Sequence, residues 1–194
     1  FGPAASAALS AGKDNYAGQG LRDRIYAWPA YSRCRVEEET LDPPQNLANV
    51  LVSGRGLFAI EYALFYSGND TECPEGSPTE QTWTSLTADE IAARKASYAA
   101  AAARDVRAQS DALVEAWSAS GGNFRESFVS ATGKYPSEQE ALNVLGWALI
   151  YVEKEVKDWK LGIPAGYTMD APVSGPESPY ARTATDNLRA NLRG

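Results

Sequence analysis

Hydrophobic residues recur along this chain at steps of three and four, the spacing that gathers them on one face of an α-helix. The clearest series begins at a capping box formed by Ser137 and Glu140 and ends near Gly162 and Pro164. Its apolar positions predict a seam that packs against other helices. These positions are Leu142, Leu145, Leu149, Val152, Val156 and Trp159.

A second capping box, Thr87 with Glu90, opens a long helix that is predicted to reach about residue 119. No segment alternates apolar and polar residues as a half-buried strand does. The chain is therefore predicted to be all-α, folded as an up-and-down helical bundle. Further helices are predicted at 21–28, 31–41, 45–52 and 183–193, a long loop at 68–78, and a solvated face at the three acids 37–39.

The stretch 54–65 is the centre of this organisation. One predicted helical face is apolar except for Glu61, and a buried carboxylate must be paired, hydrogen-bonded or protonated. Two interpretations stay open: Glu61 is a satisfied acid that ties helices together, or it belongs to a ligand site. The face comprises Leu57, Phe58, Glu61, Leu64 and Phe65, and the basic partners we expect for the acid are Arg33, Arg35 and Arg55.

The composition excludes several kinds of partner and of catalytic or metal site. A net charge of −7 argues against nucleic acid as a partner and permits cations. The chain has no histidine, which excludes a Ser-His-Asp triad and every zinc site that contains histidine. No run of about 18 apolar residues is present, so no transmembrane segment is predicted.

The two cysteines, Cys34 and Cys73, do not form a Cys-x-x-Cys pair. An even number of cysteines and a long loop that needs an anchor favour one disulfide in an oxidising compartment. Two unpaired thiols are the alternative.

Several motifs, spread in order over nearly the whole chain, resemble the imelysin-like family. The most specific is Arg-Gly-Leu-x-Ala-Ile-Glu-Tyr-x-Leu-Phe at 55–65. The other similar segments are 25–29, 32–37, 158–164 and 187–192.

The resemblance implies an all-α fold of two packed four-helix bundles. It also implies a bacterial protein that is exported to the periplasm or anchored at the outer membrane, often as a lipoprotein. Family members include iron-regulated proteins, subunits of iron-uptake systems and proteins once described as metallopeptidases. The family signature is G-x-H-x-x-E, in which Gly56 and Glu61 match and Phe58 stands in place of the histidine. One carboxylate is a poor transition-metal site, so no metal site is predicted, although the resemblance leaves iron or another cation open.

A whole family domain is longer than 194 residues. We therefore expect residues 1–194 to be one imelysin-like domain that is incomplete at both ends, with the remainder of its own domain as one expected partner. Iron- or haem-uptake membrane proteins are the other expected partners.

Three functions follow. The first is a non-enzymatic envelope protein linked to iron or haem acquisition that binds a ligand or partner near the motif. The second is a metallopeptidase, which a chain without histidine disfavours. The third is a polysaccharide-binding or scaffolding protein, for which Trp28, Tyr31, Trp83 and Tyr167 are the loop aromatics. The candidate ligand-binding residues are Gly56, Glu61, Arg55, Arg33 and Trp28, and no catalytic residue is predicted.

Overall fold

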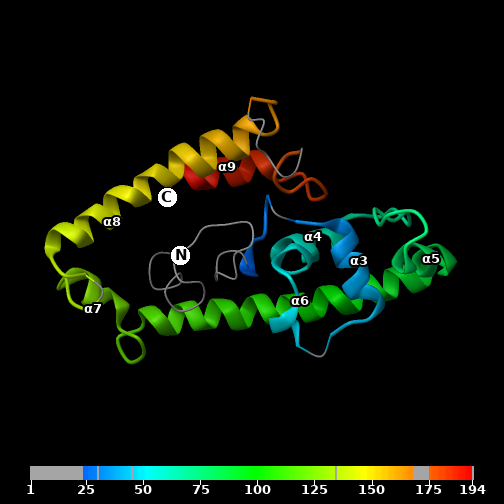
Figure 1. Cartoon of the computed structure of the whole chain (residues 1–194), viewed down its shortest axis with the longest axis horizontal. Coiled ribbons are helices and arrows are strands. Elements are labelled where there is room, and N and C mark those ends of the chain that lie inside the picture. The colour runs from blue at the N-terminus through cyan, green and yellow to red at the C-terminus, as the bar shows by residue number, and fades with distance from the viewer. Residues whose placement is uncertain (1–23, 30, 45, 134, 168–174, 194) are drawn as a thin grey trace.

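The computed structural model describes residues 24–29, 31–44, 46–133, 135–167 and 175–193. All regular structure in these residues is helical, which confirms the all-α prediction. The longest helix, α6 (Ala88–Trp117), runs along one edge of the molecule (Figure 1). The chain turns at α7 (Phe124–Val129) and returns along the opposite edge as α8 (Glu138–Tyr151) and its π-helical continuation η3 (Val152–Gly162). Helix α9 (Ala184–Arg193) lies against η3.

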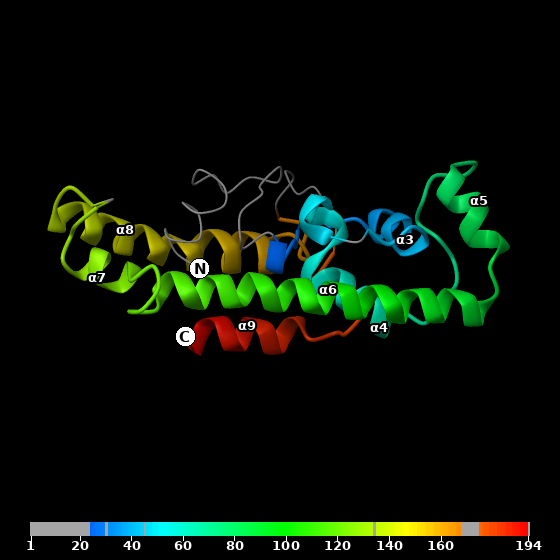
Figure 2. The same cartoon turned by 90° about the horizontal axis from the view of Figure 1, so that it is seen from below.

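The N-terminal half of α6 carries the main core. Helices α3 (Arg33–Leu41) and α4 (Gly56–Phe65) pack on it, and α5 (Pro78–Ser85) lies beyond them at one end of the molecule (Figure 2). Buried residues of α6 fall in its first half and follow the helical spacing. The core cluster consists of Val36, Leu47, Val50, Phe58, Ala59, Tyr62, Tyr98 and Ala102.

Side-chain caps set several helix starts. The predicted capping box of α6 is present: the Glu90 amide donates to Thr87 Oγ1 and the Thr87 amide donates to the Glu90 carboxylate. Ser137 likewise accepts from the Glu140 amide ahead of α8. Ser32 caps α3 by accepting from the Arg35 amide, so this helix starts two residues later than predicted.

Two predicted helices need correction, and two observed helices were not predicted. The predicted helix at 45–52 is replaced, within its described part, by two short 3₁₀ turns, η1 (Leu47–Asn49) and η2 (Val52–Gly54). The backbone is extended at Val50 and Leu51, with ψ of 136° and 144°, so a continuous helix cannot form. Helices α5 and α7 were not predicted. For α5 the signal was present, since Ser77 is an N-cap and Pro78 occupies the first turn. Of the predicted helix at 21–28, residues 21–23 lie outside the described residues. Only Arg24 and Ile25 of the remainder are helical, so the helix ends three residues before the predicted Trp28.

A second, smaller core closes the turn between α6 and α8. Phe124, Tyr135 and Ala141 are buried there, and Trp117 meets Phe124 edge to face. The seam predicted along α8 is wrong in part, because Leu142, Leu145 and Val152 are exposed and only the later Val156 is buried. Among the described elements, the main contacts of α8 are with α7 at its start and with η3, which continues it, so its middle is little covered. The side chain of Leu149 lies outside the described residues.

No helix in the described part of the chain is both long enough and apolar enough to cross a membrane.

Candidate functional site

Helix α4 begins at a glycine for two structural reasons. Gly56 has a φ of 75°, which side chains rarely tolerate. A Cβ at this position would also lie 2.7 Å from the Ile25 carbonyl oxygen and 2.8 Å from that of Arg24. Gly56 therefore lets the segment before Pro29 cross the start of α4 at close range.

Arg55, immediately before α4, is fully buried and bound to α6. Its Nη2 lies 2.5 and 2.6 Å from the two carboxylate oxygens of Asp105, and its Nε donates to Oδ2 at 3.1 Å. The two charges compensate each other and fix the start of α4 on α6. One buried donor, Nη1, has no partner among the described residues.

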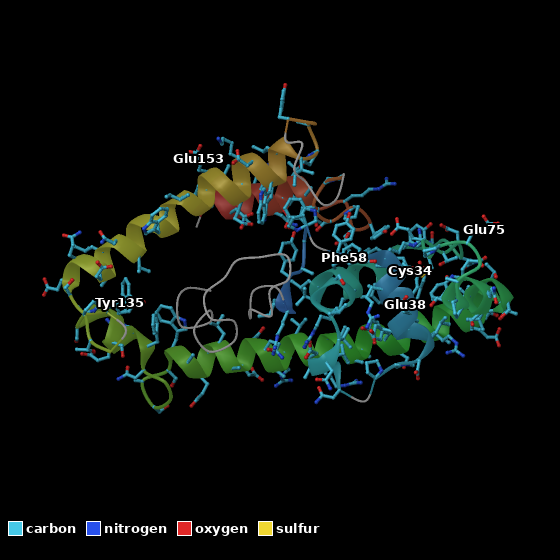
Figure 3. All side chains as sticks on the ribbon, viewed as in Figure 1. Cys34, Glu38, Phe58, Glu75, Tyr135 and Glu153 are labelled. Carbon is cyan, nitrogen blue, oxygen red and sulfur yellow. A yellow bond between two sulfur atoms is a disulfide. The ribbon has the colours of Figure 1, made fainter. Side chains whose placement is uncertain are left out.

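The aromatic candidates belong to the core. Phe58, at the signature histidine position, belongs to α4 (Figure 3) and is 2% exposed. Its ring stacks on that of Tyr31, with centroids 3.8 Å apart. Trp28 is 1% exposed, and its indole N–H has no acceptor among the described residues. Neither ring presents a face to solvent.

Glu61 is half-buried, and its partners are not the predicted ones. Its Oε1 accepts the backbone N–H groups of Tyr180 at 2.8 Å and Ala181 at 2.9 Å. The predicted pairing with an arginine is wrong, because each of the three arginines has other acids as partners. Arg33 pairs with Glu37 and Asp70, Arg35 with Glu38 and Glu39, and Arg55 with Asp105.

The face of α4 that carries Glu61 is also not the buried one. Phe58, Ala59 and Tyr62 face the core, whereas Leu57, Leu64 and Phe65 are 45%, 60% and 60% exposed. The prediction was therefore right for Phe58 alone among the apolar members. The helix buries its aromatic side against α3 and α6, and this leaves Glu61 at the border between the segment 175–182 and solvent.

Sequence reasoning missed the most buried acid. Glu37 was assigned to a solvated face, yet it is 0% exposed and accepts four hydrogen bonds. The donors are Arg33 Nε at 2.7 Å, Tyr62 Oη at 2.8 Å, Thr71 Oγ1 at 2.6 Å and the Glu72 amide at 3.1 Å. This set of donors replaces the hydrogen bonds to water that the buried carboxylate has lost. Arg33 is thereby committed to the fold, since its Nη2 also bonds Asp70.

Lys95 of α6 is a second buried charge behind the same loop. It is 4% exposed, and its ammonium donates to the carbonyls of Tyr66 at 3.1 Å and Gly68 at 2.9 Å. The rings of Tyr62 and Tyr66 lie 4.8 and 5.0 Å from it. Burial, and then the nearby charge of Arg33, lower the pKa of Lys95. Lys95 and Glu37 together hold the loop 66–77 on the core.

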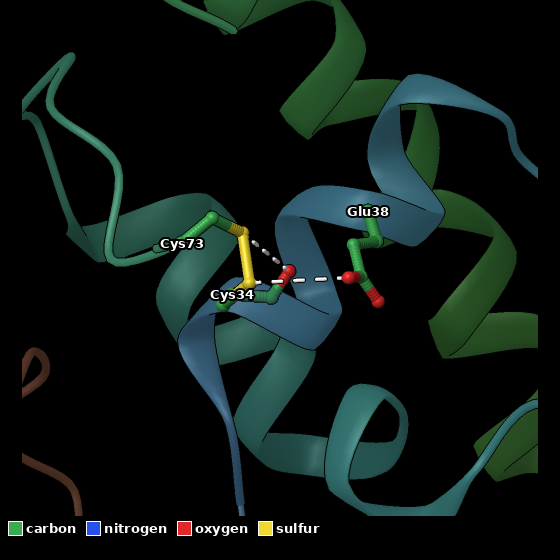
Figure 4. A group of neighbouring side chains, drawn as sticks. All are labelled: Cys34, Glu38 and Cys73. Carbon is green, nitrogen blue, oxygen red and sulfur yellow. Dashed lines mark hydrogen bonds between the residues drawn. A yellow bond between two sulfur atoms is a disulfide. The ribbon is translucent and has the colours of Figure 1, made fainter. Parts of the chain in front are cut away.

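The predicted disulfide is confirmed. Cys34 of α3 and Cys73 of the loop are bonded, with Cα atoms 4.6 Å apart. Glu38 lies one turn after Cys34 on the same helix, and these three side chains form the one group of acids and cysteines close enough for a metal among the described residues (Figure 4). While the sulfurs are bonded to each other they are not thiolates, so the group is not a metal site in this form.

A further buried ion pair lies at the other end of the segment 175–182. Lys160 of η3 lies 3.0 Å from Glu177 Oε2 and donates to Asn191 of α9 at 2.6 Å. Tyr26 also donates to Glu177. The same ammonium donates a hydrogen bond to Glu177 Oε1 at 3.1 Å, so it lies between the two carboxylate oxygens. Glu61 and Glu177 thus anchor one segment at two points.

Comparison with protein families gave a match to the imelysin family over residues 3–194. This chain belongs to the imelysin family. Searches of curated proteins and of solved structures gave no match.

In this imelysin-family chain the G-x-H-x-x-E positions are divided between two tasks. Gly56 and Phe58 serve the packing of α4, because one lets the chain cross closely and the other fills the core. Glu61 alone reaches solvent, and its Oε2 has no partner in the described part of the chain. Of the five candidate residues, only Glu61 combines a charge with exposure and an unused acceptor.

Proposed function

We propose that this imelysin-family chain is a non-enzymatic protein of the bacterial envelope that binds a partner protein through α4, in the context of iron or haem acquisition. The observation that carries the proposal is the exposed face of α4. A half-exposed carboxylate, Glu61, lies there among three exposed apolar side chains, Leu57, Leu64 and Phe65.

This face has the composition of an interface. Apolar residues that gather on one exposed helix face, with a polar group among them, are typical of protein-binding surfaces. Glu61 is held in place by two backbone N–H groups while its second oxygen remains available. The expected partner therefore offers an apolar surface and a cationic or N–H donor that meets this oxygen.

The surroundings support binding over catalysis. A metallopeptidase needs ligands for a metal-bound water and a general base. Phe58 fills the signature histidine position with a buried ring, and the nearby acids Glu37 and Asp105 are committed to structural bonds. We expect a purified sample to show no chelator-sensitive cleavage of a protein substrate, and such cleavage would contradict the non-enzymatic role.

The location in the envelope rests on two supports. A disulfide persists in oxidising compartments such as the periplasm, and the imelysin family is associated with the bacterial envelope. The link to iron rests on the family alone.

Site-specific cross-linking tests the binding face. A photoreactive amino acid replaces Leu64 on α4, and a matched control replaces Arg107, a strongly exposed residue on α6. In iron-limited cells we expect an adduct at position 64 with an envelope protein of metal uptake, and none at position 107. Equal labelling at both positions, or none at 64, would refute the α4 interface.

A second function, glycan binding, is favoured by one specific feature. Tyr167 is 86% exposed and borders a cavity of about 430 Å³ at the end of η3, together with Leu161 and Asp158. An exposed ring beside polar groups suits a sugar face. Trp28 and Trp83, the loop aromatics for which core packing was the equal alternative, are buried and do not contribute. Binding on a glycan panel that Tyr167→Ala abolishes would support this function, and a panel without binding would exclude it.

A further inference from the structure

Three metal-ligating side chains converge where the loop 66–77 meets α3. The ligand atoms of Cys34, Glu38 and Cys73 all lie within 4.8 Å of one another (Figure 4). Cys34 and Glu38 are one helical turn apart and so share a face of α3, while Cys73 approaches from the loop. Two thiolates and a carboxylate are a donor set suited to zinc and similar divalent metals, but only when the sulfurs are not bonded to each other.

Glu38 is held with one oxygen free to act as a ligand. Arg35 binds its Oε2 at 2.9 Å, and the other oxygen, Oε1, lies 4.0 Å from Cys34 Sγ. The side chain of Glu38 is 40% exposed, so an ion in solvent can reach it. Arg35 is in turn compensated by Glu39 at 2.6 Å, which limits its repulsion of a cation.

The loop has anchors that do not depend on the disulfide. Glu37 accepts from Thr71 and from the Glu72 amide, the two residues directly before Cys73. Trp83 donates from its indole to the Asn69 carbonyl at 3.0 Å, and Lys95 donates to the Gly68 carbonyl. These bonds keep Cys73 beside Cys34 after the sulfur–sulfur bond is broken. Because the ligands remain in place, little conformational entropy is lost when a metal binds.

We propose that reduction of the Cys34–Cys73 bond converts this disulfide into a binding site for Zn²⁺ or a similar thiophilic divalent cation. A dithiol supplies two electrons and two protons, becomes a disulfide itself, and leaves two protein thiols. Zn²⁺ then displaces the two thiol protons to solvent and binds both sulfurs together with Glu38 Oε1. The three ligands leave a fourth position for water.

The required movement is small. With Zn–S bonds of about 2.3 Å in tetrahedral geometry, the sulfurs must separate to about 3.8 Å. We expect rotation of the two cysteine side chains about their Cα–Cβ bonds to provide this separation. The helix α3 and the anchored loop need not move.

The test compares metal binding by the oxidised and reduced forms of the whole chain. The protein is reduced with a phosphine, freed of reductant under argon and titrated with Zn²⁺ by calorimetry, while circular dichroism follows its helix content. We expect about one Zn²⁺ per chain in the reduced form and none in the oxidised form. Cd²⁺ should give a thiolate charge-transfer absorption in the reduced form alone.

Two matched variants identify the ligands. Glu38→Gln should weaken Zn²⁺ binding by about tenfold or more, since the loss of even an outer contact costs that much. Glu75→Gln removes the same charge from an exposed position on the loop and should leave the affinity within about twofold. Failure of the reduced protein to bind, equal binding by Cys73→Ser, equal effects of the two glutamate variants, or loss of helix on reduction would each overturn the proposal.

Discussion

Removal of the Glu61 carboxylate tests whether this acid is a capped, solvent-facing group or one half of a buried ion pair. In the structure Oε1 accepts two backbone N–H groups, from Tyr180 and Ala181. A buried hydrogen bond to a charged acceptor contributes about 1.5–3 kcal/mol. Because Glu61 is half-exposed, water replaces part of each bond, and we expect Glu61→Ala to lower the free energy of unfolding by about 1–2 kcal/mol.

Glu61→Gln keeps an acceptor oxygen at the same place and loses only the charge, so its expected cost is about 0.5 kcal/mol. Urea unfolding at neutral pH measures both values, and hydrogen exchange should show faster exchange of the Tyr180 and Ala181 amides in the alanine variant. Glu75→Gln, at an exposed loop position, is the control and should leave stability unchanged. A cost of about 3–5 kcal/mol for Glu61→Ala would refute this reasoning, because a loss of that size indicates a stranded buried charge.

Three further predictions concern the disulfide, the glycine that begins α4 and a buried tyrosine. Cys73→Ser opens a loop whose ends are 39 residues apart, and urea unfolding should show a loss of about 4 kcal/mol from the disulfide, with helix content retained. Gly56→Ala places a Cβ at a positive φ and 2.7 and 2.8 Å from two backbone oxygens. Thermal unfolding should show that it lowers the free energy of unfolding by more than about 2 kcal/mol. Gly133→Ala is the control and should lower it by less, because that position has a positive φ but open space around it. Burial, and then the charge of Glu37, raise the pKa of Tyr62, so the folded chain retains a proton that the unfolded chain releases above about pH 10. Stability present below that pH should fall as pH rises above it, and Tyr62→Phe should reduce this fall; an unchanged slope would contradict the assignment.

Local signals in the sequence were sufficient for most helices. Thr87 with Glu90 forms the predicted capping box, and the helix that follows has the predicted start. The pairing of Cys34 with Cys73 was also predictable, because the chain has no other cysteine and the loop needed an anchor. The capping box depends only on residues that are close in the sequence, and two cysteines can form only one intramolecular disulfide.

The orientation of α4 was not predictable in the same way. Leu57, Leu64 and Phe65 share a face with Phe58 at helical spacing, yet only Phe58 is buried. Hydrophobicity does not distinguish the side that faces α6 from the side next to solvent when both are apolar. The donors to Glu61 are backbone N–H groups 119 and 120 residues away in the sequence. Nearly every residue has such a group, so no residue type indicates which one will be the partner.

Glu37 is a second case in which the sequence pattern did not predict burial, here of an acid that was expected to face solvent. In a run of three acids, Glu38 and Glu39 pair with Arg35 and keep 40% and 11% of their side chains exposed. Glu37 turns fully inward and accepts four hydrogen bonds. Its spacing from Arg33, one helical turn, was visible in the sequence, but an exposed pair has the same spacing. What decides burial is the supply of further donors, here Tyr62 and the loop after Asp70, which tertiary folding brings together. The loop is therefore fixed by an acid inside α3 as well as by the disulfide, and this double attachment is why we expect the reduced chain to keep its two thiols side by side.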